Sequence, residues 1–131
     1  DLIILDDEDL HQQSYKNQII KPKWLDYKSK YRMLTFQLKA DHRRLYREKW
    51  EYYGGKATNK IYIAKPFDIK VLKTDLGVYI SSDDDIIDIE LKIEYYETLV
   101  QFIEGVIKSI DNRSWDIKHA QDWKKFLAGS F

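Results

Sequence analysis

A seven-residue hydrophobic repeat is the most regular pattern in this chain. It begins at Ile86 and recurs in alternating steps of three and four residues, without an exception. Such spacing places apolar side chains on one stripe of a helix and is typical of coiled-coil or bundle interfaces. The positions are Ile86, Ile89, Ile93, Tyr96, Val100, Ile103, Ile107 and Ile110. A second apolar row, Leu99, Phe102 and Val106, lies beside it, so one row can face the chain's own helices while the other meets a partner.

Local signals delimit this C-terminal helical region. A Ser81-Ser82 pair predicts the helix cap, and the acids at 83–85 would occupy the first turn, where the helix dipole favours negative charge. Residues 111–114 (Asp-Asn-Arg-Ser) are typical of a turn. A last helix is then predicted over 115–128, ending at Gly129.

A second long helix is predicted over residues 23–53, which contain no Gly or Pro. Its apolar positions step by three and four residues, as expected for one helix face. They are Trp24, Tyr27, Tyr31, Leu34 and Leu38. Lys21-Pro22 predicts a break before this helix, because proline lacks an N–H and disfavours a helical predecessor. Gly54-Gly55 predicts its end.

Short β-like runs separate the two helical regions. Residues 61–63, 69–72 and 78–80 are rich in Ile, Val and Tyr and are divided by Lys65-Pro66 and a glycine turn. We therefore expect a mainly α fold of long helices, with a small β-hairpin or extended loop near 57–80. Within one compact unit, residues 1–80 would carry the binding helix and loop, and residues 81–131 would serve oligomerisation.

The charge distribution changes this picture, although the net charge of the 131 residues is zero. Residues 16–73 hold sixteen Lys and Arg against five acids, whereas residues 74–131 hold six against twelve. Residues 1–15 hold five acids and no Lys or Arg. A basic middle between acidic ends concerns binding partners rather than the fold.

Catalytic motifs are absent from the sequence. It has no cysteine, its three histidines are not at metal-ligand spacing, and it has no Gly-x-Ser-x-Gly. The turn at 54–58 lacks the phosphate-loop frame, and the acids at 83–85 are better explained as a helix start than as a cation site. We expect no enzyme activity, no metal and no cofactor. No apolar run approaches the roughly 20 residues of a membrane span.

The segment 43–53 alternates cations and aromatic residues at helical spacing. Proteins that bind single strands combine cations that follow the phosphates with rings on which bases stack. The candidate nucleic-acid-binding residues are Arg43, Arg44, Arg47, Lys49, Tyr52, Tyr53 and Lys56, with Tyr46 as a further stacking candidate. The alternative interpretation is that the aromatic residues are core and the cations form a solvated face, paired locally with Glu48 and Glu51.

Three segments, taken together and in register, resemble a known family. They are Lys23-Trp24-Leu25, the helix end Trp50-Glu51-Tyr52-Tyr53-Gly54-Gly55-Lys56, and the tail Asp116-Ile117-Lys118-His119-Ala120-Gln121-Asp122 with Ala128-Gly129. Across roughly residues 23–129 the chain is similar to the UvsY-like recombination mediators of T4-like phages.

The resemblance implies a non-catalytic protein that acts in the cytoplasm of the infected bacterial host. The family binds single-stranded DNA, forms ring-like homo-oligomers of about six or seven subunits, and helps a RecA-like recombinase to replace single-strand-binding protein. Its DNA-binding pattern is Lys-x-Arg-Leu-Asp-Tyr-Tyr. Here Arg47 and Lys49 take the cationic places, residues 51–53 the end, and Trp50 replaces the aliphatic residue.

Self-association in that family uses the C-terminal helices, in agreement with the repeat described above. The candidate oligomerisation residues are Ile93, Tyr96, Val100, Ile103, Ile107 and Ile110. Two other interpretations of the sequence remain. The chain can be a structural oligomer whose basic stripe binds acidic proteins, or an architectural protein that binds duplex DNA.

Overall fold

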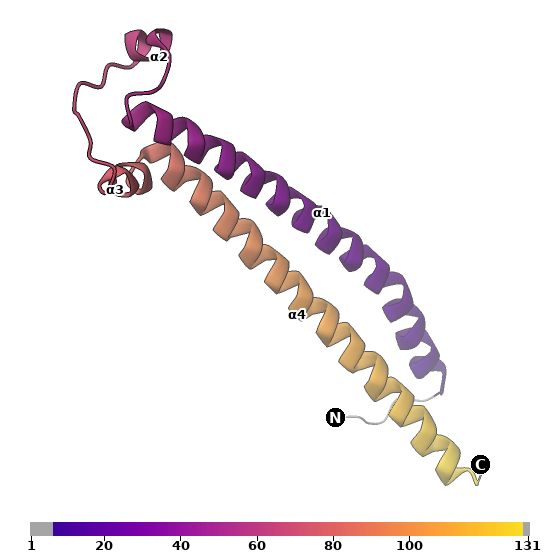
Figure 1. Cartoon of the computed structure of the whole chain (residues 1–131). Coiled ribbons are helices and arrows are strands. Elements are labelled where there is room, and N and C mark those ends of the chain that lie inside the picture. Colours follow the sequence, from indigo (N-terminus) through magenta and orange to yellow (C-terminus); the bar gives the residue numbers. More distant parts are fainter. Residues whose placement is uncertain (1–6, 130–131) are drawn as a thin grey trace. The chain divides into compact units, whose positions relative to one another are not determined.

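The protein is all-helical throughout the residues that the structure describes. The computed structural model describes residues 7–129, with side chains from residue 9 onward. Its elements are α1 (Asp7–Tyr53), α2 (Asn59–Ala64), α3 (Leu76–Ser81) and α4 (Asp84–Leu127), and no strand occurs between residues 7 and 129 (Figure 1). The predicted mainly α fold is confirmed.

Two compact units divide the chain, and each contains part of α1 and part of α4. The central unit is Arg32–Thr98, and the terminal unit combines Asp1–Tyr31 with Leu99–Phe131. The predicted assignment of residues 1–80 to binding and residues 81–131 to oligomerisation is a division of roles, not of compact units. It stays a prediction.

In the central unit, the end of α1 runs antiparallel to the start of α4 (Figure 1). The Lys39 ammonium lies 2.9 Å from a carboxylate oxygen of Glu97, and that of Lys49 lies 2.7 Å from Asp85. Partner numbers on α4 fall as those on α1 rise, as antiparallel helices require. The small core of this unit is buried Leu76, Ile80 and Ile86, against which Leu45, Tyr53 and Val71 pack.

In the terminal unit, the first half of α1 is joined to α4 by polar contacts. The Asn17 amide donates to the Ser114 hydroxyl at 3.1 Å, the Lys21 ammonium lies 2.6 Å from Asp111, and Arg113 donates to Gln13. Among the described residues of this unit, four hydrophobic side chains are buried: Leu10, Val100, Ile103 and Ile117.

Two predicted breaks are wrong. Helix α1 begins at Asp7 and continues through Pro22, and α4 continues through residues 111–114. An interior proline costs a helix roughly 3 kcal/mol, which is more than the exposed Lys21–Asp111 ion pair contributes. Burial of apolar side chains in the terminal unit supplies the larger stabilisation, about 1.5–3 kcal/mol for each. Tertiary packing and these polar contacts together outweigh the local preference for a turn.

The predicted helix ends at 54–55 and 129 are confirmed. Gly55 and Gly129 have φ angles of +75° and +74°, the left-handed conformation that glycine adopts without a steric penalty. A Cβ on Gly54 would lie 2.8 Å from the Trp50 carbonyl oxygen, so a side chain there would collide with the last turn of α1.

The segment 57–80 forms two short helices rather than a hairpin. The run at 61–63 belongs to α2 and the run at 78–80 to α3, while residues 65–75 form the connecting loop. An isolated two-stranded hairpin is marginal in water. Here the Tyr62 hydroxyl instead donates to the Tyr52 carbonyl at 2.7 Å, and the Ala57 N–H donates to that hydroxyl at 3.3 Å.

The start of α4 was predicted to within a few residues, but the expected cap was wrong. Ser82 donates its hydroxyl to the Val78 carbonyl at 2.6 Å, within the turn that ends α3. Asp83 caps α4, because its Oδ1 accepts the N–H of Asp85 at 2.9 Å and that of Ile86 at 3.4 Å.

Candidate nucleic-acid interface

Three arginines form an exposed basic face near the end of α1. The side chains of Arg44 and Arg47 are 72% and 77% exposed, and Arg43 is also exposed. Arg44 lies 3.1 Å from Asp41 and Arg47 lies 3.9 Å from Glu51, both within the same helix. Exposed pairs of this kind contribute little energy and exchange readily for other anions. We refer to Arg43, Arg44 and Arg47 as the arginine face.

Lys49, although it belongs to the same basic segment, lies on a different side of α1. Its side chain is 13% exposed, and its ammonium lies 3.3 Å from Asp83 and 2.7 Å from Asp85. Burial lowers the pKa of Lys49, but the hydrogen bonds and charges of Asp85 and Asp83 outweigh it, so the pKa is raised. Lys49 is therefore a charged structural residue that joins α1 to α4, and a phosphate would have to displace two carboxylates to reach it.

Tyr53 contacts the same aspartate as Lys49 does. Its hydroxyl donates to Asp83 Oδ2 at 2.6 Å. The pKa of Tyr53 is raised by burial, and further by the hydrogen bond and charge of Asp83. Burial tends to raise the pKa of Asp83 too, but hydrogen bonds from Tyr53 and the Asp85 backbone, with the Lys49 charge, hold it below its usual value. The geometry favours a packing role for Tyr53 over base stacking.

Tyr52 is enclosed by other aromatic rings. Its ring stacks on that of Tyr62 with centroids 5.5 Å apart, and the rings of Tyr53 and Phe67 lie 5.0 and 5.4 Å away. Its hydroxyl donates to the Lys65 carbonyl at 3.1 Å. Since Tyr52 is only 7% exposed, its ring has little free surface on which a base can stack.

The turn after α1 brings Lys56 back over the helix. Its N–H donates to the Glu51 carbonyl at 2.7 Å, and its ammonium lies 4.6 Å from the centre of the Trp50 ring. Lys56 and Trp50 are both exposed. Of the predicted binding residues, Lys56 and the arginine face are therefore accessible, whereas Tyr52 is buried and Lys49 and Tyr53 are partly buried. Trp50 was not among the predicted binding residues, although it lies three residues after Arg47 in the sequence.

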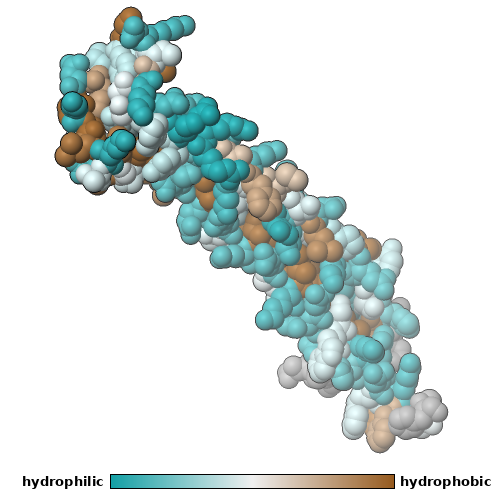
Figure 2. Space-filling model, in the orientation of Figure 1, coloured by the Kyte–Doolittle hydropathy of each residue, from teal (hydrophilic) through white to brown (hydrophobic). Residues whose placement is uncertain are grey.

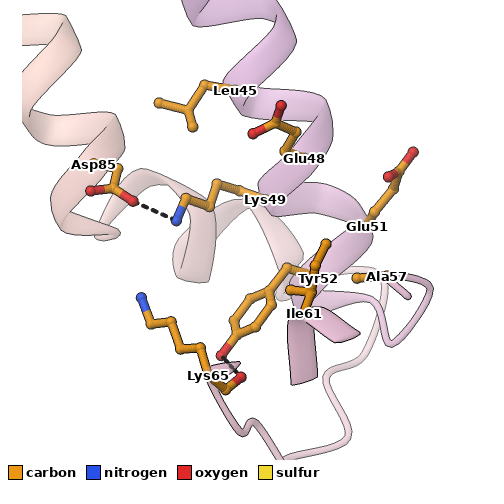
Figure 3. Close-up of a pocket in the computed structure, with 9 residues that line it drawn as sticks. All are labelled: Leu45, Glu48, Lys49, Glu51, Tyr52, Ala57, Ile61, Lys65 and Asp85. Carbon is orange, nitrogen blue, oxygen red and sulfur yellow. Dashed lines mark hydrogen bonds and ion pairs between the residues drawn. The ribbon is translucent and has the colours of Figure 1, made fainter. Parts of the chain in front are cut away.

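A cavity of about 410 Å³ lies beside Lys49, at the end of α1 and against α2. Figure 3 shows Tyr52 and Lys65 on one side of it and the Lys49–Asp85 pair on another. Glu48 and Glu51 also line it, so carboxylates and ammonium groups are mixed rather than gathered by sign. Such a lining does not favour an anionic ligand. Within residues 9–129, no cluster of three or more His, Asp or Glu is arranged to hold a metal ion.

The complementary charges of α1 and α4 partly neutralise the basic middle of the sequence. Lys39 pairs with Glu97, and Lys49 pairs with two aspartates. The paired lysines are therefore less available to bind an anionic ligand than the unpaired cations are. Arg43 forms no ion pair with any residue that the structure describes.

The loop and short helices of the central unit carry further lysines together with exposed hydrophobic residues. Lys60, Lys65, Lys70 and Lys73 are all exposed. Exposed apolar side chains accompany them, namely Ile61, Ile63, Ile69, Leu72 and Val78. Figure 2 shows brown and teal side chains mixed over the part formed by α2 and α3. Exposed cations therefore continue beyond Lys56 into the loop and the short helices.

The candidate oligomerisation residues are placed mostly inside the chain. Val100 and Ile103 are 8% and 2% exposed, so they are buried within the monomer. Ile93, Tyr96, Ile107 and Ile110 are half-buried. A different set of α4 residues is exposed: Ile87, Leu91, Tyr95 and Phe102. These four lie on one side of the helix, because steps of four and seven residues keep side chains within a narrow arc.

Over the residues described, this is an all-helical protein with exposed arginines near the end of α1. None of its described helices has the length and hydrophobicity of a membrane span. Residues 1–130 match the family described as recombination, repair and ssDNA binding protein UvsY. The chain belongs to the UvsY family.

Relatives agree in sequence and in fold. The recombination protein UvsY of Enterobacteria phage T4 is 23% identical over 127 residues, which is 97% of this chain and 90% of that protein. Two crystal structures of the bacteriophage T4 recombination mediator protein UvsY are also similar. Lattice type I gives a TM-score of 0.79 at 22% identity, over 95% of this chain and 91% of that one. Lattice type II gives 0.78 at 23% identity, over 95% and 88%.

Proposed function

We propose that the arginine face of α1 and Lys56 bind the phosphates of single-stranded DNA. The observation that carries this proposal is the accessibility of these four cations, at a place where other lysines of the segment are occupied by acids of α4. Arginine suits phosphate because its planar guanidinium presents several donors at once. Membership in a family described as single-stranded-DNA-binding supports the same ligand.

The cellular role that we infer is that of a recombination mediator in the cytoplasm of an infected bacterium. The related phage T4 protein is a recombination mediator. In this proposal the chain binds DNA covered by single-strand-binding protein and helps a RecA-like recombinase to load. A protein of this kind needs to hold the strand without reading its sequence, and phosphate contacts provide that.

Self-association would raise the affinity of the protein for the DNA strand. We propose a ring-like homo-oligomer of about six or seven copies, in which each additional protomer–strand contact is intramolecular. The exposed row Ile87, Leu91, Tyr95 and Phe102 is the better candidate for the contact between copies, because Val100 and Ile103 are already buried in the monomer. Exposed apolar rows of this kind often mark interaction surfaces.

A salt titration with matched single-stranded and duplex oligonucleotides tests the proposal. We expect a preference for the single strand and an affinity that falls with salt. The double variant Arg43→Ala/Arg47→Ala should weaken binding and make the slope of log affinity against log salt shallower by about 0.7 per lost phosphate contact. The control, Lys92→Ala/Lys118→Ala, removes the same charge from exposed positions of α4 and should bind as the wild type does.

Each competing function predicts a different result. A structural oligomer that binds acidic proteins would bind neither oligonucleotide, and an architectural protein would prefer the duplex. Equal loss of affinity in both double variants would show that net charge, rather than the arginine face, holds the strand.

A further inference from the structure

We propose that Trp50 is the stacking platform for a base of the bound strand, with Lys56 holding the adjoining phosphate; this inference rests on the proposed single-strand binding. Two of the three tyrosines that the sequence offered for stacking are occupied, whereas the third, Tyr46, is 43% exposed and lies with its ring centre 6.3 Å from that of His42. Tyr52 is enclosed by rings, and Tyr53 is hydrogen-bonded to Asp83. Trp50 is 38% exposed, and among the described residues its ring packs against no other aromatic ring.

The position of Trp50 on α1 places it beside the arginine face. It follows Arg47 by three residues and Arg43 by seven, and residues at these spacings lie on one side of a helix. The helix rises about 1.5 Å per residue, so the three side chains follow one another along roughly 10 Å of the axis. A strand held by the two guanidinium groups would therefore pass next to the indole ring.

The turn at Gly54-Gly55 places the Lys56 ammonium over the Trp50 ring. Gly54 permits the close contact with the Trp50 carbonyl, and the left-handed Gly55 reverses the chain. Lys56 then lies with its ammonium 4.6 Å from the ring centre. An exposed cation–π contact of this type is weaker than base stacking on an aromatic ring. A base can therefore replace the ammonium, which then remains close enough to bind the phosphate of the same nucleotide.

A stacking platform would also select single strands. A base in a duplex is already stacked and paired, so it cannot cover the indole ring without being extruded. Phosphate contacts alone are available on both kinds of DNA. Trp50 would consequently contribute to the preference for single strands, while the arginine face would contribute to affinity for both.

The test compares two strands that differ only in their bases. Binding of the full chain is measured by fluorescence anisotropy with an oligothymidine and with an abasic oligonucleotide of the same length and charge. We expect the wild type to prefer oligothymidine, and Trp50→Leu to reduce the ratio of the two affinities by about tenfold. Trp50→Phe should keep most of that ratio. Lys56→Ala should weaken both strands alike.

Trp115→Leu is the matched control, because Trp115 is an exposed tryptophan of the terminal unit, with 61% of its surface accessible. It should leave the affinity ratio unchanged. If Trp50→Leu keeps the ratio while both strands still bind, the stacking assignment is wrong and the proposed function stands. If the wild type binds neither strand, the proposed function itself is wrong. Circular dichroism of each variant confirms that the helices are retained.

Discussion

Tyr53 donates its hydroxyl hydrogen to Asp83 across 2.6 Å, from the last residue of α1 to the residue that caps α4. The same carboxylate receives the Lys49 ammonium at 3.3 Å. One aspartate therefore makes three kinds of contact in the central unit: a helix cap, a hydrogen bond that its carboxylate accepts from a tyrosine hydroxyl, and an ion pair. Lys49 and Tyr53, two of the candidate DNA-binding residues, thus both have partners within the protein, and their role in binding stays a prediction.

Replacing Asp83 should destabilise the central unit more than replacing its neighbour Asp84. Asp83→Ala leaves Lys49 and Tyr53 without their shared partner and removes the cap, so we expect a loss of about 3 kcal/mol in unfolding free energy. Asp84→Ala removes only an exposed charge from the first turn, worth about 0.5 kcal/mol. Urea unfolding followed by circular dichroism measures both. Similar losses in the two variants would show that Asp83 has no special role.

The raised pKa of Tyr53 predicts a specific loss of stability in alkali. The folded-state pKa lies above the unfolded value of about 10, so its contribution is complete below that pH. It is lost as pH rises through the folded-state pKa, because the unfolded chain then binds fewer protons. Tyr53→Phe should therefore show a shallower alkaline decline in unfolding free energy than the wild type. Tyr95→Phe, at an exposed tyrosine, should decline as the wild type does.

Lys49→Ala should mainly reduce stability and Arg47→Ala should mainly reduce single-strand affinity, although the two residues belong to one sequence pattern. Lys49→Ala leaves Asp83 with one partner fewer and should cost about 2 kcal/mol of stability. Arg47→Ala removes an exposed side chain and should change stability by no more than about 0.5 kcal/mol. Its effect should instead be on single-strand affinity. Thermal unfolding and anisotropy on the same two proteins separate these roles, and an unaltered melting temperature for Lys49→Ala would contradict the structural assignment.

Charges introduced on the exposed row of α4 should prevent assembly without unfolding the chain. In Leu91→Asp/Tyr95→Asp both new charges lie in solvent in the monomer, so helicity and melting should be retained while the native mass falls. Ile103→Asp instead buries a charge and should destabilise the monomer itself. Light scattering after gel filtration, with circular dichroism, distinguishes these results. An oligomer that survives the double variant would place the contact elsewhere.

Local chemistry was enough to predict the elements that end at glycine or begin at an acidic turn. The φ angles of Gly55 and Gly129 and the start of α4 depend on backbone freedom and on caps within a few residues. The apolar repeat of α4 could also be identified from the sequence, since its period depends only on the geometry of a helix. What the repeat could not reveal was which apolar row faces the chain itself.

Contacts between residues far apart in the sequence decided the rest. Pro22 stays within α1 and residues 111–114 stay helical in a unit where polar contacts join the two helices and apolar side chains are buried. The run at 61–63 lies in the short helix α2, whose Tyr62 donates its hydroxyl hydrogen to the Tyr52 carbonyl at the end of α1.

In the basic segment too, contacts between residues far apart in the sequence decide which residues can bind a ligand. Composition and spacing identified residues 43–56, because alternating cations and rings are visible in one stretch of chain. Whether a lysine is free or a ring is open depends on partners such as Asp83 and Phe67, which lie about fourteen or more residues away. Only the folded chain separates the arginine face, which can meet a phosphate, from Lys49, which is already paired.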